Sequence, residues 1–227
     1  MLNTLLGPLE PGHLHTHRNN MAKFLKTTPN VLTNPDEVRA KALTLDYYTN
    51  ANHPEIADGG EEWVCYISKD ISKEAGILSE ATIEVVNQLQ KDINQPVSNY
   101  KTYCQYTTAA SRPAYVHTDQ YLLLKENDPM RVNYIANVYI TPSDAQQEDA
   151  WFDFYKAKYI SEGASMDEYL NLTSDELDRI CFIPFEYNTS LAFDSSIPHK
   201  NAPLSNTQWG TDVTDSPLCF TVFMQTS

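Results

Sequence analysis

His117 and Asp119 stand two positions apart in the run Tyr115-Val-His-Thr-Asp-Gln120, and a second histidine, His199, follows 82 residues later. On a β-strand, residues two apart point to the same side, so His117 and Asp119 can face one cavity. Two imidazoles and one carboxylate can form a 2-His-1-carboxylate facial triad, which holds one face of an Fe(II) ion and leaves the other face open. These three residues are therefore the candidate metal ligands and the candidate catalytic residues.

The elements around these residues matter, because an isolated His-x-Asp occurs by chance in many sequences. From about residue 98 onward, short segments rich in aromatic and β-branched residues alternate with turn residues. Short strands separated by turn signals favour a β-sandwich or β-barrel. The predicted strands are 100–106, 132–140, 151–155, 180–184, 190–193 and 218–224.

Helices are predicted mainly before this region. In 34–46, Asn34 can cap the first turn and Pro35 suits its first position. The second helix, 79–93, follows the helical period, with Ser79 as its predicted cap. Two capping-box patterns predict a further helical insert at 160–180. The sequence thus predicts a single domain over 1–227: an extended arm at 1–20, helical support at 30–97 and a β core at 98–227.

The composition excludes some classes of partner. The chain has 227 residues with 30 acidic and 16 basic side chains, a net charge of −14. Such a surface argues against binding to nucleic acids or anionic membranes, which need basic patches. The first residues lack the pattern of a signal peptide and no window matches a membrane span, so a cytoplasmic location is expected. Four cysteines without a CxxC pair predict reduced core residues.

Several segments carry a resemblance in the same order along the chain. They are the early helix 34–42, Tyr106 eleven residues before His117, strand 134–142, the aromatic segment 149–155, segment 185–199 with the distal histidine, and strand 218–223. From about residue 30 to the end, the chain resembles the prolyl-hydroxylase-like branch of the iron(II) and 2-oxoglutarate-dependent oxygenases. Segment 149–155 stands where that family often has a Gly-Gly-Thr-aromatic turn, but here it lacks the glycines.

This resemblance implies an α+β, mainly β fold: a double-stranded β-helix, or jelly roll, with the N-terminal helices packed on it. It implies Fe(II) as the metal, held by His117, Asp119 and His199, and 2-oxoglutarate as co-substrate. The implied activity is a dioxygenase that hydroxylates a small-molecule or amino-acid/peptide substrate. In this family, oxidation of the 2-oxoglutarate to succinate and carbon dioxide accompanies the hydroxylation.

One departure concerns the far carboxylate of 2-oxoglutarate. The family normally binds it with an arginine at the start of the last strand, where this chain has Ser216 and Pro217 and no basic residue follows Lys200. A guanidinium suits that task because it binds a carboxylate bidentately. Arg131 is the first candidate to replace it, because jumonji-type oxygenases place a lysine near that spacing. Lys125 and Lys200 are weaker candidates.

Tyrosines complete the candidate co-substrate site. Tyr106, on resemblance, and Tyr134 are the expected co-substrate-binding tyrosines, and Tyr103 and Asn133 are further residues that could line the pocket. Two alternatives stay open at this point. The chain could be an Fe(II) oxygenase that does not use 2-oxoglutarate, with the substrate itself chelating the metal, or a non-catalytic jelly-roll binding module.

Overall fold

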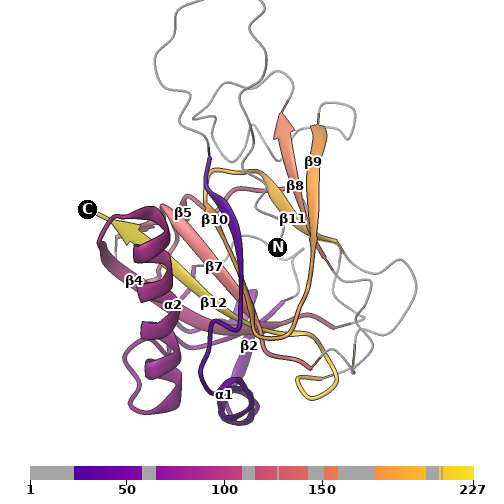
Figure 1. Cartoon of the computed structure of the whole chain (residues 1–227). Coiled ribbons are helices and arrows are strands. Elements are labelled where there is room, and N and C mark those ends of the chain that lie inside the picture. The colour runs from indigo at the N-terminus through magenta and orange to yellow at the C-terminus, as the bar shows by residue number, and fades with distance from the viewer. Residues whose placement is uncertain are drawn as a thin grey trace, which may run out of the picture.

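The computed structural model describes residues 23–57, 65–108, 116–126, 128–142, 151–157, 177–202, 210 and 212–227. This part of the chain is mainly β, with antiparallel strands and two α-helices (Figure 1). The mainly β class predicted from the sequence is confirmed. The predicted arm at 1–20 lies outside the described residues, as does most of the predicted insert at 160–180.

The largest sheet has seven strands in the order β1-β10-β7-β12-β4-β3-β2. All its described pairings are antiparallel. Its central strands β7 and β12 carry almost continuous runs of buried residues, as expected for strands covered on both faces. The strands are β1 (Leu25–Pro29), β2 (Tyr47–Thr49), β3 (Tyr66–Ser68), β4 (Val97–Tyr106), β7 (Tyr134–Tyr139), β10 (Thr189–Asp194) and β12 (Leu218–Thr226).

A three-stranded sheet and a short hairpin face this large sheet. The three-stranded sheet has the order β11-β8-β9, and the hairpin pairs β5 with β6. Figure 1 shows β8, β9 and β11 at an angle to the long strands of the large sheet. The strands are β5 (Tyr121–Leu122), β6 (Met130–Arg131), β8 (Trp151–Ala157), β9 (Leu177–Pro184) and β11 (His199–Ala202).

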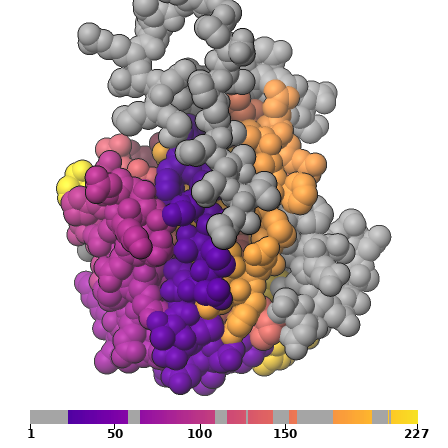
Figure 2. Space-filling view, viewed as in Figure 1, coloured from indigo at the N-terminus to yellow at the C-terminus, as the bar shows by residue number. Residues whose placement is uncertain are grey.

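Both helices, α1 (Pro35–Ala42) and α2 (Ile77–Ile93), pack on one side of the large sheet (Figure 1). The buried residues of α2 recur three or four positions apart, which gives the helix one apolar stripe. The space-filling view of this side shows the indigo residues around β1 between the magenta α2 and the orange strands near the C-terminus (Figure 2). No helix in the described ranges is long and apolar enough to cross a membrane.

The large sheet separates two apolar clusters. One lies between the sheet and the helices and includes Phe220, Val138 and Leu89. The other lies between the sheet and the smaller strands and includes Phe154, Phe193 and Ile135. Because side chains alternate across a strand, each residue of β4, β7 and β12 belongs either to the helix side or to the opposite side. This alternation decides which residues can reach the candidate site.

The structure corrects several predicted boundaries. The first helix ends at Ala42 rather than at 46, and the second begins at Ile77 with Gly76, not Ser79, as its N-cap. Strand β9 begins at Leu177, so the last residues assigned to the helical insert are extended. The region 30–97 also contains the short strands β2 and β3, which pair with each other and extend the large sheet. The four cysteines are free thiols, and three of them are buried.

Asn188 fixes the turn that precedes β10. Its backbone has a φ of 53°, in the left-handed region that residues other than glycine and asparagine rarely adopt. Its buried side-chain amide accepts a hydrogen bond from the Leu32 amide at 2.9 Å and donates one to the Leu32 carbonyl at 3.0 Å. Asn188 thereby ties the segment after β1 to the start of β10.

Replacing Asn188 tests this role. Asn188→Ala loses both hydrogen bonds and strains the backbone, so we expect a loss of about 2–4 kcal/mol in the free energy of unfolding. Asn188→Gly loses the same bonds but tolerates the positive φ, and it should be more stable than the alanine variant by about 1 kcal/mol. Urea unfolding measures both values. Equal stability of the two variants would contradict the contribution of the left-handed backbone.

Candidate metal centre

A single backbone bridge brings the two histidines together. The His117 amide donates to the His199 carbonyl at 3.0 Å, and the His199 amide donates to the His117 carbonyl at 2.9 Å. In an antiparallel pair, residues that exchange both hydrogen bonds stand directly opposite each other with their side chains on the same face. The two imidazole rings consequently lie with centroids 4.6 Å apart.

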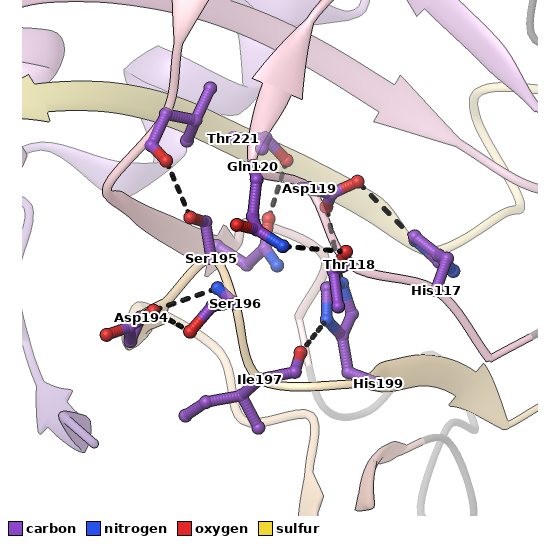
Figure 3. Close-up of polar contacts among 12 residues, drawn as sticks. His117, Thr118, Asp119, Gln120, Asp194, Ser195, Ser196, Ile197, His199 and Thr221 are labelled. Carbon is purple, nitrogen blue, oxygen red and sulfur yellow. Dashed lines mark hydrogen bonds and ion pairs between the residues drawn. The ribbon is translucent and has the colours of Figure 1, made fainter. Parts of the chain in front are cut away.

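Asp119 completes the cluster. Its carboxylate oxygens lie 3.7 Å from His117 Nε2 and 3.3 Å from His199 Nε2, as Figure 3 shows with dashed lines. One potential ligand atom from each of the three residues lies within 4.8 Å of the others. Two ligand atoms at about 2.1 Å from one metal and at right angles are about 3 Å apart, so small side-chain movements suffice for a common ion.

The neighbours of His199 hold its ring in a ligand orientation. Its Nδ1 lies 2.8 Å from the Ile197 carbonyl, which accepts only if the proton is on Nδ1. Nε2 is then the ring nitrogen that faces Asp119, the arrangement typical of metal-ligating histidines. The aromatic rings of Phe193 and Phe152 pack on the imidazole with centroids 4.8 and 5.7 Å away. The ring is therefore fixed before any metal binds.

Backbone contacts position Asp119 in the same way. The Asp119 amide donates to the Ser195 carbonyl at 3.0 Å, and the Ser195 hydroxyl donates to the Val132 carbonyl at 2.6 Å. Burial raises the pKa of the Asp119 carboxyl, but the neighbouring His117 and His199 outweigh this and hold the pKa below its usual value. The carboxylate is thus ionised at neutral pH, which is the form that binds a metal ion.

A cavity of about 200 Å³ opens at this cluster. His117, Asp119 and His199 form part of its wall, and strands β4, β7, β8 and β12 all contribute aromatic rings to it. Tyr121, with 60% of its surface exposed, also borders it. A mostly apolar cavity with a few polar groups is the usual form of a small-molecule site.

Register decides which residues of the large sheet face this cavity. Thr221 pairs with Tyr103 on one side and Asn137 on the other, so these three side chains form a row across β4, β12 and β7. The next row consists of Gln105, Cys219 and Tyr139. All six residues line the cavity. Of these six, only Tyr103 was named from the sequence as a pocket residue, and its period-2 spacing to Gln105 was the available signal for a second one.

The two tyrosines predicted to bind the co-substrate pack on the helix side of the large sheet. Tyr134 alternates with the cavity residue Ile135, does not line the cavity, and packs edge-on against Phe24 on the helix side. Tyr106 borders the cavity, but its ring stacks on Tyr66 with centroids 4.8 Å apart, in the helix-side cluster. The geometry therefore does not favour Tyr134 as a co-substrate residue, because the residue one position away faces the cavity. The role of Tyr106, which borders the cavity, stays a prediction.

The expected cations are also placed away from the cavity wall. Arg131 is exposed on β6 and does not line the cavity, so this geometry does not favour its predicted role as the carboxylate-binding residue. Lys125 donates to the His53 carbonyl at 2.6 Å, and Lys200 lies over the Tyr155 ring. Within the described ranges, no lysine or arginine lines the cavity.

The fold is similar to that of known proteins, although the sequence is not. No family model and no curated protein matches the chain in sequence, but its structure has the fold of the iron(II) and 2-oxoglutarate-dependent oxygenases. The resemblance inferred from the sequence is confirmed at the level of the fold.

Three solved structures illustrate the similarity. A prolyl-4-hydroxylase of Pseudomonas putida matches with a TM-score of 0.52 and 14% identity, over 90% of this chain and 93% of its own. HygX of Streptomyces hygroscopicus, with nickel, 2-oxoglutarate and hygromycin B bound, matches with a TM-score of 0.54 and 16% identity, over 88% and 82%. SnoN, a non-haem α-ketoglutarate-dependent epimerase of nogalamycin biosynthesis, matches with a TM-score of 0.62 and 13% identity, over 88% and 78%.

The position of Arg131 yields a direct prediction. Since this side chain is exposed and does not line the cavity, Arg131→Ala should leave the affinity of the nickel-loaded protein for 2-oxoglutarate unchanged within about twofold. Isothermal titration calorimetry measures this affinity, with Lys156→Ala, another exposed cation, as the control. If Arg131→Ala alone lost tenfold or more in affinity for 2-oxoglutarate, Arg131 would be a co-substrate-binding residue after all.

Proposed function

We propose that the chain is a non-haem Fe(II)- and 2-oxoglutarate-dependent dioxygenase that hydroxylates a small-molecule or amino-acid/peptide substrate. The observation that carries the proposal is the cluster of His117, Asp119 and His199, whose ligand atoms converge within 4.8 Å at the wall of a cavity. 2-Oxoglutarate is the co-substrate that the resemblance implies, and it is bound in the similar HygX structure.

The donor set fits the metal. Imidazole and carboxylate in a facial arrangement suit Fe(II) and leave positions free for a chelating oxo acid and oxygen. When bound, Fe(II) supplies the oxygen chemistry, and the chain supplies position and exclusion of water. Phe152 and Phe193 pack around His199, and Ser195 holds the backbone of Asp119.

The proposed architecture is one double-stranded β-helix domain. The pairing of His117 with His199 joins the strand region of β11 to the segment before β5, and the seven-stranded sheet faces the three-stranded sheet across the second apolar cluster. This arrangement supports the jelly roll that the resemblance implies. The cavity volume of about 200 Å³ supports a small molecule or a single side chain as the group that reaches the metal.

Anaerobic titration with Fe(II) tests the proposal. Asp119→Ala removes the only carboxylate of the cluster, so we expect the iron affinity to fall by at least about 100-fold. Glu126→Ala, which removes an exposed carboxylate, is the matched control and should bind iron like the wild type. Circular dichroism confirms folding of both variants. Unchanged iron affinity in Asp119→Ala would rule out this metal centre and favour a non-catalytic binding module.

A further inference from the structure

Two exposed apolar side chains border the cavity close to the metal cluster. Tyr121 and Leu123 follow Asp119 by two and four residues, and both line the cavity. Tyr121 is 60% exposed and Leu123 is 42% exposed, so each side chain contacts solvent as well as the cavity. Ile56, whose backbone pairs with Leu124, lines the same cavity. These three residues, Ile56, Tyr121 and Leu123, are here called the apolar rim, and exposed apolar surface at a cavity is typical of a binding site.

Backbone pairing on both sides fixes the segment that carries Tyr121 and Leu123. On one side, Tyr121 stands opposite Arg131 in the hairpin of β5 and β6. On the other side, the Leu123 carbonyl accepts a hydrogen bond from the Ala57 amide at 3.0 Å. The exposure of these two side chains therefore does not come from a loose backbone, because both edges of the segment are paired.

His53 holds the part of the rim that contains Ile56. Its Nδ1 accepts hydrogen bonds from the amides of Glu55 at 3.1 Å and Ile56 at 2.9 Å, and its Nε2 lies 2.8 Å from the Ser68 carbonyl. Because Nδ1 accepts, the proton is on Nε2, which donates to Ser68. The imidazole is fully buried, and this burial lowers its pKa, so the neutral form that makes these bonds is favoured.

Apolar surface continues from the cavity wall to a metal ligand. The rings of Tyr139 and Phe185 stack with centroids 3.7 Å apart, and Phe152 lies 5.9 Å from Phe185 and 5.7 Å from the His199 ring. All four residues line the cavity. A ligand group that fills this space removes apolar surface of the wall from water, which favours an apolar group.

On these grounds we infer that the apolar rim binds a flat, apolar group of the substrate, such as an aromatic ring, and so holds a neighbouring substrate atom at the metal cluster. Tyr121 supplies the main contact, because a tyrosine ring offers a large flat surface with few rotatable bonds to order. The inference rests on the proposed function, since it names the substrate class of the same metal centre.

Paramagnetic relaxation tests the inference on the full chain loaded with Mn(II) and 2-oxoglutarate. Mn(II) accepts imidazole and carboxylate ligands and relaxes the protons of any molecule bound near it. The probes are benzyl alcohol, which has a flat apolar ring, and myo-inositol, a ring of similar size covered with hydroxyls. We expect a saturable relaxation enhancement for benzyl alcohol and an affinity for myo-inositol that is at least about tenfold weaker. Equal affinities, or no enhancement for benzyl alcohol, would overturn the inference.

Variants of Tyr121 test the assigned contact. Tyr121→Ala should lower the affinity for benzyl alcohol about fivefold, whereas Tyr121→Phe, which keeps the ring, should bind it like the wild type. Phe182→Ala is the matched control, because Phe182 is 57% exposed on β9 and does not line the cavity. Circular dichroism checks that each variant folds. The role of Tyr121 is overturned if Tyr121→Ala binds like the wild type, if Tyr121→Phe loses as much affinity, or if Phe182→Ala does.

A metal titration separates failure of the inference from failure of the proposed function. Mn(II) binding that is unaffected by Asp119→Ala would contradict the proposed metal centre. If Asp119→Ala abolishes Mn(II) binding while the wild type gives no relaxation enhancement for benzyl alcohol, the proposed function stands and only the inference about the substrate is overturned.

Discussion

The candidate site depends on the pair of backbone hydrogen bonds between His117 and His199. These bonds join two segments that are 82 residues apart in sequence and place both imidazoles on one face. Other contacts of the cluster lie next to this pairing. The turn before His199 brings Ser195 to the Asp119 amide, and β8 pairs with β11 so that Phe152 and Phe154 lie beside the His199 ring.

The sequence predicted the local elements better than their partners. Aromatic and β-branched runs predicted β4, β7, β10 and β12, and the apolar period predicted α2, because these signals lie within one segment. The strands β2, β3, β5 and β6 have only two or three residues and carry no such pattern. Their existence depends on the neighbours they pair with, which no local pattern reports. The same holds for the His117–His199 bridge: residue types and spacing predicted a shared metal site, but no local pattern predicted that the two backbones pair.

Strand parity explains why the metal cluster was easier to predict than the co-substrate wall. His117 and Asp119 are two apart, and that spacing puts them on one face in any extended segment. Tyr103 and Tyr106 are three apart on β4, so Tyr103 packs in the cavity-side cluster and Tyr106 packs in the helix-side cluster while bordering the cavity. A shift of one residue moves a side chain across the whole sheet. The choice between these faces was settled by the pairing of Thr221 with Tyr103 and Asn137, which is a long-range contact.

The described cations near the cavity make contacts that stabilise the fold. Lys101 neutralises Asp70, and Lys125 caps the His53 carbonyl, which leaves hydroxyl, amide and thiol groups to form the polar part of the wall. Among the described residues, the charged groups at the cavity are therefore those of the metal cluster, where the Asp119 carboxylate lies 3.7 Å from His117 Nε2 and 3.3 Å from His199 Nε2. A carboxylate held between two imidazoles binds a metal ion most strongly when the ion replaces the charge that desolvation leaves uncompensated.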